Sequence, residues 1–204
     1  MAAFDAVSDA TRTIADKLTA GLASLAQPPW SMNPPPICQI NDLTTPIGQP
    51  PPAPLLTLTL YEILEDPSAR NRPNRRTIDR TTGNVIVTRQ PVALLLRYFT
   101  TAWTGDAVSD QLVLGRAIQI LDDNAIIGGA DLQGTLFDHD EALNITMTPM
   151  SIEDRTWYWR AIESRYRVSA NYEVRVVKID PDSELELPPV TSRRLTVGDR
   201  AELG

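Results

Sequence analysis

The sequence predicts an α+β domain with a mainly antiparallel sheet flanked by helices, an N-terminal amphipathic helix and an extended C-terminal arm. Three observations support this class. Segments with helical or strand periodicity follow one another in the order helix, strand, strand, helix, strand, helix, strand. No strand–helix unit carries a glycine-rich phosphate loop. The length of 204 residues, 42% of them hydrophobic, fits one domain with extensions better than two domains.

The first predicted element is an amphipathic helix over residues 3–26. Its apolar stripe consists of Phe4, Val7, Ile14, Leu18, Leu22 and Leu25. Residues 27–54 follow and hold ten of the 17 prolines. Because proline fixes φ and donates no hydrogen bond, this segment is interpreted as an extended polyproline-type connector. A long surface loop is favoured over a docking motif for a proline-binding module.

Two long strands come next. Residues 55–64 alternate leucine with threonine and tyrosine, which is typical of a half-buried strand. Residues 91–103 alternate as well, with Arg97 on the side opposite to Val92, Leu94, Leu96 and Tyr98. Gly83-Asn84 lies between the two strands and is a turn signal, so the segment that joins them is predicted to be a long β-hairpin connection.

The second half of the domain continues with a helix over residues 110–123. Ser109 or Asp110 is its predicted N-cap, and its apolar spacing comes from Leu114, Ala117, Ile118 and Leu121. Residues 143–149 predict a strand that Pro149 ends.

An aromatic-rich helix is predicted over residues 151–164, where Ser151 and Asp154 have the spacing of a capping box. Residues 171–179 form the last predicted strand of the sheet. We therefore expect one domain over residues 1–180. Residues 181–204 are expected to form an arm without a core of its own.

Composition and charge exclude several classes of protein. Cys38 is the only cysteine, which excludes an internal disulfide and a cysteine-rich zinc site. No apolar run reaches 18 residues, and Asp5 and Asp9 stand where a signal peptide would carry positive charge. We therefore expect a soluble chain that is made in the cytoplasm and does not insert into membranes. The net charge of −7 argues against nucleic acid as the main partner.

The sequence predicts no catalytic or metal site and no cofactor. The densest polar cluster consists of Asp138, His139, Asp140 and Glu141, and clustered oxygens suit hard cations. Neighbours in sequence diverge on a strand and on a helix, however, so a solvated acidic turn is the favoured interpretation. His139 is the only histidine, and neither a nucleophile elbow nor a phosphate loop occurs. We expect a protein that is not an enzyme.

Four blocks of the sequence together resemble one known family. They are "LTLYEILEDPSARNRP", "PVALLLRYFTTAW", "LVLGRAIQILDDNAIIGGADL" and "ITMTPMSIEDRTWYWRAIESRYRVSANYEVRVVKID". The resemblance covers residues 3–180, in the same order and at the expected separations. The family comprises the cap, or tube-terminator, proteins of bacterial contractile injection systems, which are related to the tail terminators of contractile phages.

This resemblance implies a tail-terminator-like fold and a structural function. We expect a ring of six subunits that closes the baseplate-distal end of the inner tube, stops its growth and anchors the sheath. The implied partners are further copies of the chain, the inner-tube protein and the sheath protein; a tape-measure or second cap protein is a further candidate. The assembled particle could be cytoplasmic, membrane-anchored or released.

Two alternatives to this function stay open. The first is a cap adaptor between the tube end and a separate cap protein. The second comes from a different class and is an α+β module that binds a ligand or nucleic acid. Rings in electron micrographs would distinguish a terminator from such a module.

An arginine cluster at residues 68–80 is the first predicted interface. It combines five arginines with one acid, in a chain whose net charge is −7. The resemblance places Arg70, Asn71 and Arg72 on an Arg-Asn-Arg-Pro motif of the family, and the loop continues with Arg75, Arg76 and Arg80. We expect these residues to pair with an acidic surface of a neighbouring subunit, tube or sheath protein, because guanidinium groups pair bidentately with carboxylates. The competing interpretation is a solvated loop.

The arm is the second predicted interface. Leu185 and Leu187 alternate with acidic residues in "SELELPPV", and Arg193 and Arg194 begin "RRLTVGD". Such alternation predicts an edge strand that adds to the sheet of a partner. An unbound tail is the competing interpretation.

Overall fold

The structure is a computed structural model, and it describes residues 4–42, 53–69, 73–134, 136, 142–161, 163–179, 181 and 184–188. The chain forms two compact units. The first unit comprises residues 1–71 and 91–180, and the second comprises residues 72–90 and 181–204. None of the helices in the described ranges has the length and hydrophobicity to cross a membrane.

A six-stranded sheet forms the centre of the first unit, with the strand order β1-β2-β5-β8-β7-β6. β1 pairs with β2 in parallel, and all other neighbours in this sheet are antiparallel. The predicted class, with its mainly antiparallel sheet, is therefore confirmed. The strands are β1 (Ile37–Asn41), β2 (Leu55–Glu65), β5 (Val92–Trp103), β6 (Ile126–Gly128), β7 (Ala142–Met147) and β8 (Ser169–Ile179).

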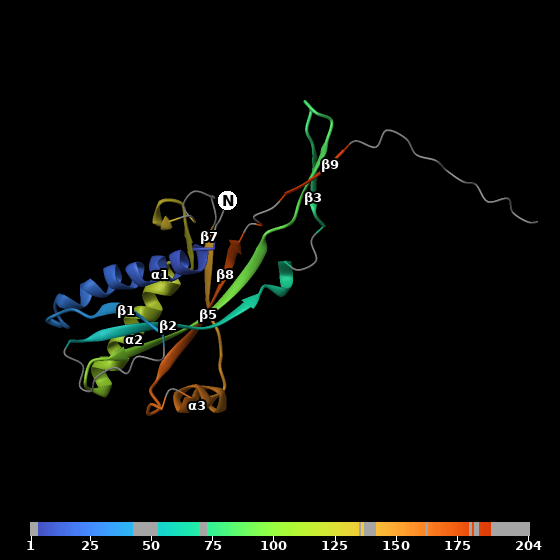
Figure 1. Ribbon diagram of the computed structural model, residues 1–204. Coiled ribbons are helices and arrows are strands. Elements are labelled where there is room, and N and C mark those ends of the chain that lie inside the picture. The colour runs from blue at the N-terminus through green and yellow to red at the C-terminus, as the bar shows by residue number, and fades with distance from the viewer. Residues whose placement is uncertain are drawn as a thin grey trace, which may run out of the picture. The chain divides into compact units, whose positions relative to one another are not determined.

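The α-helices cover both faces of this sheet (Figure 1). They are α1 (Ala6–Leu22), α2 (Ala107–Asp123) and α3 (Ile152–Ala161), and short 3₁₀ turns occur at Ala23–Ala26, Pro67–Ala69 and Gly129–Asp131. Tyr98 of β5 bonds to Thr11 of α1, whereas the next residue, Phe99, contacts Tyr158 of α3. Because consecutive strand residues point to opposite faces, α1 and α3 lie on opposite sides of the sheet.

The main core lies between the sheet and the pair α1 and α2. Leu56 and Leu58 of β2 are fully buried there together with Ile14, Leu18 and Leu22 of α1. The two helices approach each other closely at Gly21. A Cβ atom at this position would lie 2.5 Å from Cδ1 of Ile120 on α2, so only glycine fits without a shift of the Ile120 side chain.

The opposite face of the sheet is more polar. α3 packs there through Tyr158, which contacts Tyr61 and Phe99 edge to face, and through Trp159, which contacts Trp103. Trp159 is therefore buried against the sheet, whereas Trp157 on the same helix is exposed. The Ser151 hydroxyl accepts from the backbone N–H of Asp154 at 3.0 Å, which confirms the predicted cap of this helix.

Several details of the prediction for this unit are wrong. Phe4 is 88% exposed, so the buried stripe of α1 begins at Ala6. α2 begins three residues earlier than predicted, because the Asp106 carboxylate accepts from the N–H groups of Val108 and Ser109 and is the N-cap. An irregularity of pairing between Leu94 and Leu96 interrupts the expected alternation in β5, and Val92 is exposed.

Two short strands of this sheet are absent from the prediction. β1 lies inside the segment interpreted as a polyproline connector, and it pairs with the first half of β2. β6 follows α2 and pairs with β7. The order of the seven predicted helices and strands is otherwise confirmed by α1, β2, β5, α2, β7, α3 and β8.

Tyrosines that are buried wholly or in part predict a pH dependence of the stability of this unit. Burial raises the pKa of Tyr61, Tyr98 and Tyr172 from 10.0 to about 12. Because these folded-state pKa values lie above the unfolded value, the stabilisation is complete below about pH 10 and is lost as the pH rises toward 12. We expect the urea midpoint to fall steeply over this interval, together with the appearance of tyrosinate absorbance. A midpoint that stays constant above pH 10 would contradict this expectation.

Candidate functional site

The second unit contains a three-stranded antiparallel sheet, which we call the arm sheet. Its strands are β3 (Arg75–Ile78), β4 (Val85–Thr88) and β9 (Glu184–Leu187), in the order β3-β4-β9. β3 and β4 form a hairpin of their own inside the segment that was predicted as a long connection between β2 and β5, and these two strands are absent from the prediction. β9 comes from the predicted C-terminal arm. The structure thus places parts of both predicted interfaces in one small sheet.

A polar turn closes the β3–β4 hairpin. The backbone N–H of Gly83 donates to the carbonyl oxygen of Asp79 at 2.8 Å, and Gly83 has a φ of +76°, which favours glycine. The Asp79 carboxylate accepts from the backbone N–H of Thr81 at 2.8 Å and from the Thr82 hydroxyl at 2.7 Å. These hydrogen bonds lower the pKa of Asp79. The turn predicted at Gly83-Asn84 is therefore confirmed.

One face of the arm sheet is apolar and exposed. Val85 is paired with Ile78 on one side and with Leu187 on the other, and Val87 is paired with Leu185. Directly paired residues share a face, so these five aliphatic side chains lie together, with Arg76 at their edge. Ile78 is 66% exposed, Leu185 58% and Leu187 42%. Exposed aliphatic side chains in one cluster are typical of a contact surface.

The other face of the arm sheet is mostly polar. Arg75, Thr77, Thr88 and Glu186 lie on it by the same register, together with the single aliphatic residue Ile86. Glu186 fixes β9 to the hairpin, because its Oε1 atom accepts from the side-chain amide of Asn84 at 2.6 Å.

The predicted interface residues that the structure describes fall into two groups. Arg75 and Arg76 lie on β3, Arg80 lies in the hairpin turn, and all three side chains are exposed. Leu185 and Leu187 lie on β9, where they pair with the hairpin of their own chain, although the sequence pattern had suggested the sheet of a partner. The predicted residues outside the described ranges are Arg70, Asn71, Arg72, Arg193 and Arg194, and the acidic cluster at 138–141 also lies outside them.

Sequence reasoning missed the apolar face of the arm sheet. The residues that it missed are Ile78, which precedes the turn, and Val85 and Val87, which follow the turn at a spacing of two. This alternation was a usable signal, but the arginines of the same segment dominated the interpretation. Within the described ranges, no group of three or more histidine, cysteine, aspartate or glutamate residues could hold a metal ion.

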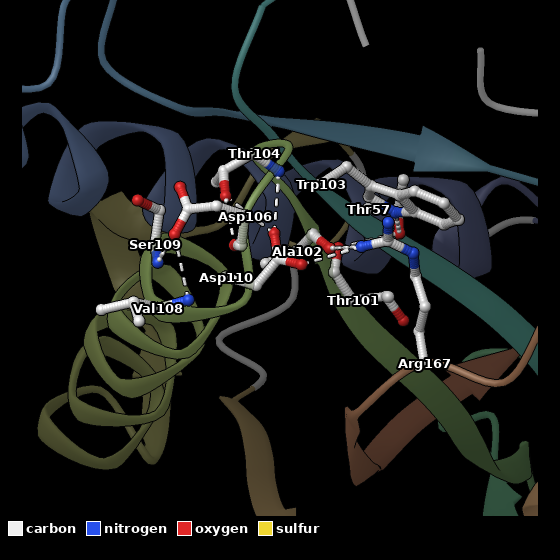
Figure 2. Close-up of polar contacts among 10 residues, drawn as sticks. All are labelled: Thr57, Thr101, Ala102, Trp103, Thr104, Asp106, Val108, Ser109, Asp110 and Arg167. Atoms are coloured by element: carbon white, nitrogen blue, oxygen red, sulfur yellow. Dashed lines mark hydrogen bonds and ion pairs between the residues drawn. The ribbon is translucent and has the colours of Figure 1, made fainter. Parts of the chain in front are cut away.

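A polar cluster in the first unit joins β5, α2 and the segment before β8 (Figure 2). One carboxylate oxygen of Asp110 accepts from the backbone N–H and the hydroxyl of Thr104, both at 2.8 Å. The other oxygen accepts from Arg167 at 2.8 Å. The Arg167 guanidinium also lies over the Trp103 ring, 4.4 Å from its centroid. The cluster fixes the turn between β5 and α2, and it shows no reactive geometry.

α3 presents a second exposed apolar feature. Trp157 and Ile152 are exposed on this helix, and the Arg160 guanidinium lies 5.8 Å from the centroid of the Trp157 ring. Tryptophan and arginine are enriched among the residues that contribute most to protein interfaces. The exposed side of α3 is therefore a candidate contact surface of the first unit, on the side of the sheet opposite to α1.

Most of the chain matches one protein-family model. Residues 9–193 match the family model described as the Pvc16 N-terminal domain. No curated protein matches the chain significantly.

Two solved structures share the fold. One is the sheath/tube terminator of the extracellular contractile injection system PVC in its extended state, with a TM-score of 0.57 and 20% identity over 95% of this chain and 65% of that chain. The other is the tube terminating cap of the anti-feeding prophage, with a TM-score of 0.52 and 20% identity over 89% of this chain and 59% of that chain. The chain thus spans somewhat less than two thirds of the length of each.

Proposed function

Since the chain belongs to the Pvc16 N-terminal domain family, we propose that it is a structural subunit that terminates the tube of a contractile injection system. In this role, six copies form a ring on the last layer of the inner tube, at the end away from the baseplate. The ring stops further growth of the tube and anchors the sheath. The observation that carries the proposal is the fold shared with a sheath/tube terminator over 95% of the chain.

The proposed role requires contact surfaces and no reactive pocket. A terminator must dock on the ring beneath it, and it must not offer the docking site for another tube layer. A closed ring also needs two different patches that meet on neighbouring copies. The arm sheet and the exposed side of α3 are candidate contact surfaces for these roles, with different chemistry.

The arginine cluster has a defined place in this proposal. Arg75, Arg76 and Arg80 are exposed, and no ion pair of theirs occurs within the part of the chain that the structure describes. We assign them, with Arg70, Asn71 and Arg72, to contacts with acidic surfaces of neighbouring subunits, tube or sheath. Arg193 and Arg194 have the same role in the arm.

A tube-growth experiment tests the proposed function. The full chain is added to the polymerising inner-tube protein of its particle at physiological salt. We expect electron micrographs to show six-fold rings at one end of each tube, and we expect the tubes to be shorter because growth stops at that end. A chain that neither binds tube ends nor changes the distribution of tube lengths is not a terminator.

Alanine variants test the proposed role of the arginines in the same experiment. The Arg70→Ala and Arg72→Ala double variant should bind tube ends more weakly, with a smaller dependence on salt concentration. Glu163→Ala, a change at an exposed position of the first unit, serves as the control. Equal binding by both variants and the unaltered chain would favour a solvated loop.

A further inference from the structure

The arm sheet has two open edges. Within the described residues, β3 pairs only with β4, and β9 also pairs only with β4. The outer side of each edge strand therefore presents backbone N–H and C=O groups that another strand can pair with. Both edge strands have four residues, and the side chains described on them are exposed.

The two edges carry opposite charge. β3 has the sequence Arg-Arg-Thr-Ile, and β9 has the sequence Glu-Leu-Glu-Leu. Opposite charges on neighbouring strands attract, whereas like charges opposite one another destabilise the pair. Each edge therefore repels a second copy of itself and attracts the other edge.

We propose that β9 of one copy of this chain pairs with β3 of the next copy, so that the arm sheets of neighbouring copies join edge to edge. The occupant of each open edge is thus a second copy of the chain. This inference deepens the proposed ring and rests on that proposal for the number of copies. The pairing itself can be tested without any tube or sheath protein.

The register of the arm sheet defines the geometry of this pairing. β3 and β9 both run antiparallel to β4, so they run in the same direction. When two copies join with their apolar faces on one side, β9 and the next β3 therefore form a parallel pair. In the register that aligns their ends, Leu187 lies beside Ile78 of the next copy, and both are on the apolar face. The apolar face then continues from copy to copy.

Electrostatic complementarity follows from the same register. Glu186 and Arg75 share the polar face of the sheet. In this register Glu186 lies beside Thr77 of the next copy, and Arg75 of that copy is two residues before Thr77, so it is a diagonal neighbour of Glu186 on the same face. Diagonal neighbours at this spacing are within reach of long side chains. Glu186 retains capacity for this contact, because the hydrogen bond from Asn84 occupies only one of its two carboxylate oxygens.

The alternatives with two identical edges are disfavoured. An antiparallel pair of two β3 strands brings Arg75 and Arg76 of both copies together, and a pair of two β9 strands does the same for Glu186. The favoured contact is heterologous, with a different strand from each copy. In a linear row of copies, a heterologous contact leaves the outer edge of β3 unpaired at one end and that of β9 unpaired at the other. Both edges are paired in every copy only when the row closes into a ring.

Cysteine crosslinking tests the pairing directly. The single variants Ile78→Cys and Leu187→Cys are purified separately, mixed in equal amounts and oxidised. Within one copy these positions lie on the two outer strands, roughly 10 Å apart across β4, which is beyond the reach of a disulfide. The unaltered chain is the control for crosslinks through Cys38, the cysteine that every variant retains; burial raises the pKa of this thiol to about 12 and so lowers its thiolate fraction.

We expect covalent dimers in the mixture and none in either variant alone. A chain that carries both cysteines should give a ladder of multimers. A mixture that stays monomeric, or a single variant that dimerises as well as the mixture, overturns the proposed pairing.

Charge reversal gives a second test that does not depend on disulfide geometry. Arg75→Glu should weaken self-association about three- to thirty-fold. Adding Glu186→Arg should restore part of the loss, because the exchanged charges attract again although the hydrogen bond from Asn84 to Glu186 is removed. Arg165→Glu is the matched control, because it changes the net charge by the same amount as Arg75→Glu but lies at an exposed position of the first unit, outside the arm sheet. Equal weakening by Arg165→Glu, or no restoration in the double variant, overturns the pairing.

The outcomes separate this inference from the proposed function. Six-fold rings on tube ends without the mixed crosslink would leave the terminator function standing and place the contact between copies elsewhere. The mixed crosslink without binding to tube ends would support the pairing of β9 with β3 and contradict the terminator function.

Discussion

The Tyr98→Ala variant is expected to lose about 3–5 kcal/mol of unfolding free energy, which is typical for the removal of a buried aromatic ring. Tyr98 is the largest of the fully buried side chains, and it lies in the centre of β5 between the neighbouring strands β2 and β8. Its hydroxyl is 2.9 Å from the hydroxyl of Thr11 on α1. The substitution therefore opens a cavity between sheet and helix and removes the polar contact that joins them.

The measurement is urea unfolding followed by circular dichroism. Tyr98→Phe is the control, since it keeps the ring and removes only the hydroxyl, and we expect it to cost about 0.5–1.5 kcal/mol. Thr11 retains a hydrogen bond to the backbone carbonyl of Val7 in this control. Equal losses for the two variants would show that the hydroxyl contact, and not the packing of the ring, dominates at this site.

Arg167→Ala is the second substitution with a large expected effect, about 2–3 kcal/mol, because it removes charged hydrogen bonds from a largely buried site. Arg167 and Asp110 are 23% and 20% exposed, so water screens their ion pair only partly. The variant leaves the Asp110 carboxylate without its guanidinium and uncovers one side of the Trp103 ring. Thermal unfolding measures the loss.

Arg165→Ala provides the comparison for this prediction. Arg165 is exposed two residues away in the same segment, so its replacement should change stability by less than about 0.5 kcal/mol. If the two arginine variants unfold at the same temperature, the polar cluster does not stabilise the junction of β5 and α2.

The long helices and strands of the first unit were predictable because buried apolar residues recur along them at a regular spacing. Leu56 and Leu58 mark β2 by alternation, and Ile14, Leu18 and Leu22 mark α1 by helical spacing. The cap at Ser151 was equally readable, since a hydroxyl three residues before an acid is a local signal. Such features depend on residues near one another in the sequence.

The features that the sequence did not reveal depend on distant partners. β1 forms because Ile37–Asn41 pairs with Leu55–Thr59 of β2. The prolines that surround β1 in the sequence indicated a connector without strands. Leu185 and Leu187 were recognised as strand residues, but their partner, the hairpin more than 90 positions earlier, could not be read from a spacing of two. The N-cap at Asp106 was missed because Asp110, which bonds to Thr104, was the more conspicuous acid.

The four tryptophans of the chain occupy two kinds of environment, and this has a practical consequence. Trp103 and Trp159 are buried against each other, whereas Trp30 is 55% exposed and Trp157 is 67% exposed. Intrinsic fluorescence therefore contains a component that a soluble quencher reaches and a component that it does not. Protection of the first component, with the second unchanged, would reveal coverage of an exposed indole in an intact fold, without any label on the protein.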